Sequence, residues 1–303
     1  MDALIVTMIK IIAAMAVGFL LRKINIINDS SGRGFSSLII HVTAPCMVFS
    51  GIVSMDSSQL QNAKTLLWLG FVIYAVLIAL ALVLGKALKF GKNAGVIEAA
   101  VIFGNVSFLG FPLIQSLYGA TGLFYIALLN IHFNLFFYSL GFYLISKSGS
   151  GSKRFDPKRL LNTGIISIII AVIIYFCQIK IPDMILEPIN FVGQITSPLS
   201  MIVIGSSMAS YSLKKVFSRK KIYILSFFKL LIFPLLAWVI FKLTLGDNVL
   251  TRVICFYVGM PTAAVVGMTA IAFDGDAENA TYCNAMMTIL SLASIPALYL
   301  IMG

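Results

Sequence analysis

Charged residues are scarce in this chain. Only 11% of its 303 residues are Asp, Glu, Lys or Arg, whereas 60% are hydrophobic and the mean hydropathy is +1.01. Soluble domains carry about 25% charged residues, so this composition excludes a water-soluble globular fold. Apolar runs of about 20 residues recur along the sequence, and each is long enough to cross a hydrocarbon core about 30 Å thick. We therefore interpret the chain as an all-α polytopic membrane protein.

Residues that build metal centres and catalytic sites are also few. The two histidines form no cluster, the four cysteines show no metal-ligand spacing, and there is no HExxH motif. An intramembrane aspartyl protease needs two embedded aspartates that can meet. Asp274 and Asp276 lie together at one expected helix end, with no third Asp at membrane depth. The protease is therefore only a distant alternative, and we expect no enzyme activity, no cofactor and no metal.

Ten membrane spans are predicted from the apolar runs. They cover about 3–21, 34–54, 65–88, 95–117, 121–145, 160–177, 184–208, 222–244, 249–273 and 279–302. The first span has no small-residue cleavage site behind it, so we expect a retained helix rather than a signal peptide. The longest loop, 146–159, is basic and rich in Ser and Gly. It is predicted to be a cytoplasmic linker between a first five-span half (1–145) and a second (160–303).

The net charge of +11 is concentrated in the short loops between spans. Sixteen Lys and Arg residues lie in odd-numbered loops and four in even-numbered loops. The positive-inside rule then places the odd loops in the cytoplasm and both termini outside the cell membrane. Because membrane topology accounts for the positive charge, we expect no nucleic acid partner. The lipid bilayer and a small solute are the expected partners, and a homodimer is one allowed assembly.

Proline-containing motifs recur between the two halves. Thr43-Ala44-Pro45 in span 2 returns as Thr196-Ser197-Pro198 in span 7, an offset of 153 residues, and Pro112 in span 4 has Pro261 in span 9, an offset of 149. Because each half has an odd number of spans, a repeat between them must be inverted in the membrane. The sequence thus predicts a 5+5 inverted repeat. The alternative is that Pro and Gly are simply common in membrane helices.

Spans 4 and 9 both contain residues that interrupt helices. Span 4 carries Gly104-Asn105-Val106-Ser107-Phe108-Leu109-Gly110-Phe111-Pro112, and span 9 carries Gly259-Met260-Pro261-Thr262. Proline has no N–H and clashes with the preceding turn, so the helix of span 4 is predicted to kink or stop at Pro112. Broken backbone at membrane depth is tolerated only where it is buried in protein or lines a wet cavity. Matched breaks in two halves indicate a transporter's substrate site.

The breaks favour an anionic ligand. Half-helix N-termini present N–H groups and positive dipole ends, and the centres of spans 4 and 9 contain no Lys or Arg. The side chain of Asn105 either binds a carboxylate or satisfies freed carbonyls. Asn130 and Asn134 share one helix face and either line the site or join helices, and Asn284 and Thr288 repeat that spacing. The candidate substrate-binding residues are Gly104, Asn105, Ser107, Gly110, Pro112, Asn130, Asn134, Gly259, Pro261 and Thr262.

Two ionisable residues within spans are candidates for ion coupling. Glu98 is either a carboxylate stabilised by a helix N-terminus or a proton carrier. Lys229 either extends to the headgroups or neutralises an acidic partner or substrate. Lys10 lies mid-span and has no evident partner.

These motifs together resemble the auxin efflux carrier family, whose members include plant auxin transporters and bacterial organic-acid carriers. The similar stretches are Gly104-Asn105 with Gly110-Phe111-Pro112-Leu113, Ala44-Pro45, Ser197-Pro198-Leu199 with Gly205, Lys229-Leu230 with Pro234, and Met260-Pro261 through Asp274-Gly275-Asp276-Ala277. The chain lacks the large cytoplasmic loop of the long plant members, so it is similar to the short bacterial type.

The resemblance implies a fold and an activity. It implies ten helices in a 5+5 inverted repeat, with spans 4 and 9 crossing at their proline breaks. It also implies a secondary transporter that exports or exchanges small organic anions, such as malate- or malonate-like acids, by an elevator-like movement. A sodium-coupled symporter of bile-acid-carrier type is the main alternative. Such a symporter would need further intramembrane carboxylates around Na⁺, and this chain offers only Glu98.

Overall fold

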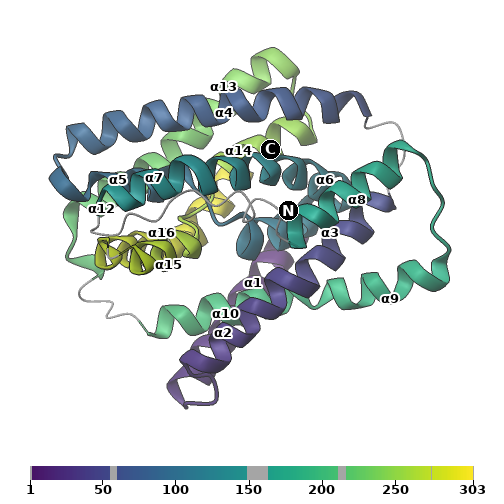
Figure 1. Cartoon of the computed structure of the whole chain (residues 1–303), viewed down its shortest axis with the longest axis horizontal. Helices are drawn as coiled ribbons and strands as arrows, with labels where there is room; N and C mark the ends of the chain where they lie inside the picture. The colour runs from purple at the N-terminus through teal and green to yellow at the C-terminus, as the bar shows by residue number, and fades with distance from the viewer. Residues whose placement is uncertain (1, 55–59, 149–162, 211–215, 274, 303) are drawn as a thin grey trace. The chain divides into compact units, whose positions relative to one another are not determined.

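A computed structural model of the chain describes residues 2–54, 60–148, 163–210, 216–273 and 275–302. Every regular element among these residues is a helix (Figure 1). The first half contains α1 (Asp2–Lys23), α2 (Asp29–Leu38), α3 (Ala44–Val53), α4 (Leu60–Ala87), α5 (Ala94–Ile102), α6 (Phe111–Phe136) and α7 (Phe142–Lys147). The second half contains α8 (Thr163–Phe176), α9 (Asp183–Gln194), α10 (Thr196–Ala209), α12 (Lys220–Phe227), α13 (Phe233–Leu245), α14 (Val249–Val258), α15 (Ala264–Ala272) and α16 (Ala277–Met302).

Six helical segments are long and apolar enough to cross a bilayer, judged by length and composition over the described residues. They are Asp29–Val53, Ala63–Ala87, Val106–Lys147, Asp183–Ala209, Lys220–Leu245 and Ala277–Met302. The segment Val106–Lys147 is interrupted at Gly119, whose φ of 61° and ψ of −150° are not helical. That turn lies between predicted spans 4 and 5. The all-helical membrane fold is confirmed, and the count of ten transmembrane helices stays a prediction.

Three π-helical turns in the described residues precede prolines. Ile39–Thr43 leads into Pro45, Val106–Gly110 leads into Pro112, and Phe228–Ile232 leads into Pro234. A proline removes one backbone donor, so a carbonyl about one turn earlier loses its partner. In the first case the hydroxyl of Thr163 donates to the Ile40 carbonyl at 3.3 Å. Wider turns of this kind often occur at functional positions in helices.

The chain forms two compact units. Unit 1 comprises Met1–Leu66, Ser107–Leu128 and Leu161–Ser212, and unit 2 comprises Leu67–Val106, Leu129–Leu160 and Leu213–Gly303. Each unit therefore draws segments from both sides of the predicted linker 146–159, most of which lies outside the described residues. The units are a different division from the predicted halves 1–145 and 160–303, which stay a prediction.

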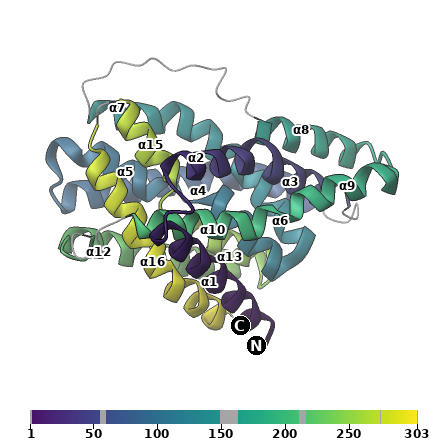
Figure 2. The same ribbon diagram turned by 90° about the horizontal axis from the view of Figure 1, so that it is seen from below.

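In unit 1, glycines allow two helices to approach closely. α1 packs along α10 (Figures 1 and 2). A Cβ on Gly18 would lie 2.0 Å from the carbonyl oxygen of Ile202, and one on Gly205 would lie 1.9 Å from that of Met15. Small residues that let backbones approach are the usual contact between membrane helices.

A second close crossing in unit 1 joins α3 to α9. A Cβ on Gly193 would lie 2.7 Å from the backbone of Met47, and the hydroxyl of Ser50 donates to the Asn190 side chain at 3.4 Å. Met47 of α3 thus lies at Gly193 of α9, and Ser50, later in α3, lies at Asn190, earlier in α9. The two helices are therefore antiparallel. The same register brings Thr43 level with Thr196, the two threonines of the repeated motif.

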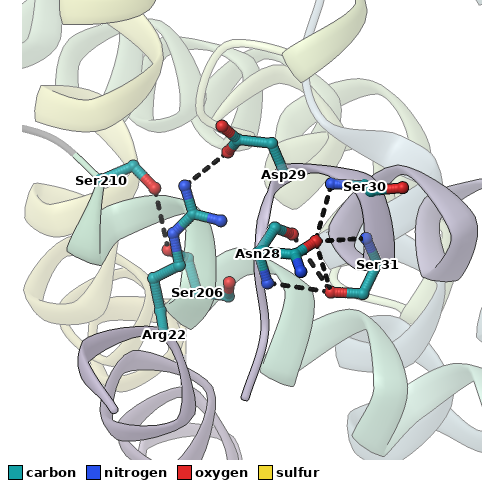
Figure 3. Close-up of polar contacts among 7 residues, drawn as sticks. All are labelled: Arg22, Asn28, Asp29, Ser30, Ser31, Ser206 and Ser210. Carbon is teal, nitrogen blue, oxygen red and sulfur yellow. Dashed lines mark hydrogen bonds and ion pairs between the residues drawn. The ribbon is translucent and has the colours of Figure 1, made fainter. Parts of the chain in front are cut away.

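The end of α1 is joined to the start of α2 by polar contacts. Arg22 forms an ion pair with Asp29, and the side chain of Asn28 caps α2 by accepting from the amides of Ser30 and Ser31, both at 2.9 Å (Figure 3). These contacts close the first loop of the chain, which the charge bias predicts to be cytoplasmic.

Unit 2 is centred on α5, α14 and the helices that pack against them. All nine residues of α5 except Ala94 are buried, and so are eight residues of α14. α16 packs against α5, α12, α14 and α15, and α13 packs against α14. The helices that precede the two breaks, α5 and α14, therefore lie in the interior of this unit.

Candidate functional site

The break in span 4 lies before Pro112. α5 ends at Ile102, and Phe103 has extended backbone angles (φ −96°, ψ 103°). Helical structure resumes as a π-helical turn at Val106–Gly110, which continues into α6. Of the kink or stop predicted at Pro112, the stop is not found, because the helix runs on through this residue. The π-helical turn directly before Pro112 widens the helix there, which accommodates the missing N–H of the proline inside a continuous helical stretch.

The break in span 9 pairs with the break in span 4. α14 ends at Val258 and α15 begins at Ala264, and between them Thr262 forms an antiparallel bridge with Gly104. The amide of Asn105 donates to the Pro261 carbonyl at 2.7 Å, and the amide of Ala263 donates to the Phe103 carbonyl at 2.9 Å. Each break thus gives one hydrogen bond to the other and receives one. Since these segments are buried, the pairing satisfies groups that lipid could not.

Gly104 is required by the closeness of this pairing. A Cβ built on Gly104 would lie 2.7 Å from the Cβ of Met260, a distance that real Cβ atoms essentially never show. The atom in the way is itself attached to backbone, so no side-chain rotation can relieve the contact. A glycine here allows the two chains to meet at bridge distance.

Thr262 and Asn284 fix the second break to its neighbours. The hydroxyl of Thr262 donates to the Ala100 carbonyl in the last turn of α5, at 2.7 Å. The Asn284 side-chain amide, from α16, donates to the Thr262 carbonyl at 2.6 Å. Asn284 therefore contacts the break directly. The polar spacing in span 10 was the sequence signal for this residue, although the candidate set did not include it.

The carbonyls around the breaks are engaged. The Phe103, Gly104, Pro261 and Thr262 carbonyls each accept a hydrogen bond, from Ala263, Val106, Asn105 and Asn284 respectively. By contrast, α15 begins after Ala263, which has no side chain that can cap the first-turn amides. Of the first-turn amides of α15, that of Val266 donates to the Ala263 carbonyl. The breaks thus occupy four carbonyl acceptors and place the positive dipole end of α15 beside them, which favours an anion over a cation.

Aromatic side chains surround the first break. The ring of Phe103 contacts the rings of Phe133 and Phe137 edge-on, with centroids 5.7 and 5.0 Å apart. The ring of Tyr74 lies 6.1 Å from that of Phe103, and its hydroxyl is 2.7 Å from the hydroxyl of Tyr257. These residues were not predicted as site residues, because single aromatic residues in an apolar span carry no periodic signal.

A chain of hydrogen bonds connects this wall to α6. The Tyr257 hydroxyl donates to the Leu129 carbonyl at 3.1 Å, so Tyr74 is the donor in the tyrosine pair. Next along α6, Asn130 and Asn134 are both buried. The Asn134 amide donates to the Asn130 carbonyl at 2.8 Å, whereas the Asn130 side-chain oxygen has no partner among the described residues. Asn134 is thus held within its own helix, and Asn130 keeps a buried acceptor.

The remaining candidates divide between the units. Gly104, Asn105, Gly259, Pro261 and Thr262 are all buried and lie at the paired breaks of unit 2. The other three, Ser107, Gly110 and Pro112, belong to unit 1. Gly259 follows α14 and lies against Pro234, since a Cβ there would be 3.1 Å from that ring.

The two candidate coupling residues have different surroundings. The Glu98 side chain, in α5, lies against Gly85 of α4, where a Cβ would be 2.8 Å from a carboxylate oxygen. Lys86 and Lys147 act on it electrostatically. Lys229 is fully buried in the π-helical turn Phe228–Ile232, so it does not extend to the surface of the protein. Among the described residues no three His, Cys, Asp or Glu side chains are grouped to hold a metal ion.

The family follows from comparison with known sequences. The model of a family described as "membrane transport protein" matches residues 3–160 and 153–302, which together span almost the whole chain. The chain belongs to this family of membrane transporters. The resemblance to auxin efflux carriers is thereby confirmed.

Two archaeal proteins are similar to this transporter over their whole length. One is an uncharacterized transporter of Methanothermobacter thermautotrophicus, 25% identical, with 96% of this chain and 95% of the relative aligned. The other is an uncharacterized transporter of Methanocaldococcus jannaschii, 26% identical, with 97% and 96% aligned. Both names agree with transport as the activity, and neither names a substrate.

Proposed function

We propose that this transporter carries small organic anions, mono- or dicarboxylates, across the cell membrane and binds them beside the paired breaks of unit 2. The observation that carries the proposal is the balance of hydrogen-bonding groups there. Four carbonyls accept hydrogen bonds from protein, whereas the first turn of α15 has no side-chain cap. A carboxylate accepts from such amides and is favoured by the helix dipole.

Asn105 supplies polarity at the paired breaks, because it is buried directly after the bridge residue Gly104. Asn130 is buried in α6, and its side-chain oxygen has no partner among the described residues. An asparagine amide donates two hydrogen bonds, enough to orient a carboxylate without a permanent charge. The aromatic residues Phe103, Tyr74 and Tyr257 provide an apolar boundary, as ligand pockets usually have.

An elevator movement of an inverted repeat is the proposed mechanism. Its support is that the chain divides into two compact units, each drawing segments from both halves. The backbone hydrogen bonds between the two breaks are also reciprocal, because each break donates one and accepts one. In this mechanism one unit would carry the anion past the other, with the ends of the chain outside the cell as the loop charges predict.

Uptake into proteoliposomes tests the proposal. Purified full-length protein is reconstituted, and entry of radiolabelled malate, malonate and propionate is measured with a pH gradient, with a Na⁺ gradient and with neither. We expect saturable carboxylate uptake or exchange, and no uptake of choline. A strict requirement for Na⁺ would favour the bile-acid-carrier type instead. Failure of all three carboxylates to exchange in active liposomes would contradict the proposal.

A further inference from the structure

Lys229 is a buried lysine with no acidic partner among the described residues. Its side chain is 0% exposed, and its ammonium nitrogen has no hydrogen-bond partner among the residues that the structure describes. None of the salt bridges found between described residues includes it. A buried ammonium ion is expensive unless it is paired. A buried lysine is therefore expected either to be a neutral amine or to have an anion beside its ammonium group.

Its level in unit 2 follows from the packing of α12 and α13 along α16. Near the start of α12, Arg219 pairs with Glu278 at 2.7 Å and lies over the ring of Tyr282. At the start of α13, Pro234 and Leu298 both flank Gly259. The two stretches therefore run in the same direction. Counting equal helical rise from these two contacts brings Lys229 level with residues 288–293 of α16.

That segment of α16 lies at the depth of the second break. Before this segment, Asn284 and Met287 contact Thr262, and after it Leu298 lies beside Gly259. Ser294, which directly follows the segment, has a buried hydroxyl that is a second polar group without a partner in the described part of the chain. An ammonium and a hydroxyl are both donors, so both suit an anion.

The helices around Lys229 do not place a charge opposite it. The elements packed against its turn are α12, α13 and α16. Their charged residues are at helix ends: Lys220 and Lys221 begin α12, Lys242 is in the last turn of α13, and Glu278 is in the first turn of α16 and bound by Arg219. The other titratable side chains on these helices are Tyr223, Tyr282, Cys283 and Tyr299.

We propose that Lys229 carries the coupling proton of transport: it is neutral without substrate and becomes protonated when a carboxylate binds at the level of the Gly259–Thr262 break. This inference rests on the proposed function. Binding takes one proton from solution, converts the amine to an ammonium, and places that charge next to the carboxylate. Release on the other side of the membrane returns the amine and the proton. One carboxylate and one proton therefore cross together.

Glu98 provides the matched comparison. It is the other ionisable candidate of unit 2, but Lys86 and Lys147 already act on its carboxylate, and it lies in the middle of α5 near the predicted cytoplasmic side. The Glu98 carboxylate thus has positive charges acting on it without a substrate, whereas the helices packed against Lys229 place no negative charge opposite it. We therefore expect Glu98→Gln to keep the proton linkage that Lys229 confers.

Proton uptake on binding is the test. Malate is titrated into purified full-length protein in weak buffer with a pH indicator, between about pH 6.5 and 8.5, where carboxylates stay ionised. Wild type should take up about one proton per malate, and its Kd should rise toward tenfold per pH unit, as one linked proton requires. Lys229→Arg should bind without proton uptake, because arginine stays charged. Lys229→Met should bind at least about tenfold more weakly and without uptake.

Stability separates this role from a structural one. Because an unpaired buried amine is replaced by an apolar side chain of similar length, Lys229→Met should melt at a higher temperature than wild type without malate. A coupling role is overturned if wild type binds malate without taking up a proton, or if Lys229→Arg still takes one up. Absence of saturable carboxylate binding by the wild type would overturn the proposed function itself, which is a different result.

Discussion

The hydroxyl of Thr262 donates a 2.7 Å hydrogen bond to the carbonyl of Ala100, 162 residues earlier in the chain. In an uninterrupted helix that carbonyl would accept from the amide of Gly104. Here Gly104 is diverted into its bridge with Thr262, so the second break supplies the group that the first break removes. The two interruptions are thus coupled, and neither is a local feature of its own span.

Replacing Thr262 by valine tests this coupling. The change keeps the shape of the side chain but leaves the Ala100 carbonyl buried without a donor, which costs about 1–3 kcal/mol. We expect a lower melting temperature in detergent and weaker malate binding. Thr262→Ser keeps the hydroxyl and should behave much like wild type. Equal melting temperatures for Thr262→Val and Thr262→Ser would show that the hydrogen bond does not stabilise the breaks.

Asn105→Ala addresses substrate contact. If the amide donates to a carboxylate, its loss removes a hydrogen bond to a charged group worth roughly 1.5–3 kcal/mol, or about ten- to hundredfold in Kd. The backbone bond from Asn105 to Pro261 is retained in this variant. Malate-dependent thermal shift on the folded protein measures the effect. A variant that loses stability yet binds malate with wild-type affinity would make Asn105 a structural residue only.

Gly104→Ala tests how closely the breaks must approach. The added Cβ would be 2.7 Å from the Cβ of Met260, so the bridge must open. We expect loss of transport and a clear fall in melting temperature. The control is Gly267→Ala in α15, where the nearest atoms would be 4.0 Å from the new Cβ. Alanine favours a helix over glycine by about 0.5–1 kcal/mol, so this control should be stable or slightly stabilised.

Membrane helices were predictable because hydropathy and span length report directly on burial in lipid. The six segments of the described residues that are long and apolar enough to cross a bilayer lie on predicted spans, and the polar residues Asn105, Asn130 and Asn134 are buried, as polar residues within spans should be. The position of the first break was not predictable from Pro112. The helix starts again at Val106, ahead of Pro112, and a π-helical turn carries it past the proline.

Where the helix of span 4 is interrupted and starts again depends on residues far away in the sequence. Phe103 leaves the helix because Gly104 pairs with Thr262, and nothing near Phe103 in the sequence announces such a pairing. The same holds for the bond between the Tyr74 and Tyr257 hydroxyls, 183 residues apart. For Lys229, sequence alone left two roles open. Its complete burial decides against contact with the protein surface.

Acid should weaken one contact between α13 and α14. A hydrogen bond from Arg252, with Lys242 nearby, holds the pKa of Asp247 below its ordinary value of 3.8. A lowered pKa means that the stabilisation is complete above that value and is lost as pH falls through the lower, folded-state pKa. Because the group is exposed, the effect should be small and should shrink with added salt. Asp247→Asn should therefore flatten the acid side of the melting-temperature profile, and an unchanged profile would contradict this.

For two buried threonines in unit 1, replacement by valine is not expected to lower stability, in contrast to Thr262→Val. Thr43 and Thr196, the threonines of the repeated proline motif, are at most 1% exposed, and neither hydroxyl has a partner in the described ranges. A buried hydroxyl that makes no hydrogen bond costs free energy, so Thr43→Val and Thr196→Val should leave stability unchanged or raise it by up to about 1–3 kcal/mol.

Ser167→Ala is the matched control for these two variants. The Ser167 hydroxyl donates to the Pro45 carbonyl at 2.7 Å, in the same motif. Removing it should lower stability by about 0.5–1.5 kcal/mol, the usual net contribution of one intramolecular hydrogen bond. Chemical denaturation or melting of the three variants in one detergent measures the difference. If Thr196→Val were destabilised as much as Ser167→Ala, the Thr196 hydroxyl would have to be bonded in the membrane-embedded protein, and its burial without a partner could not explain its behaviour.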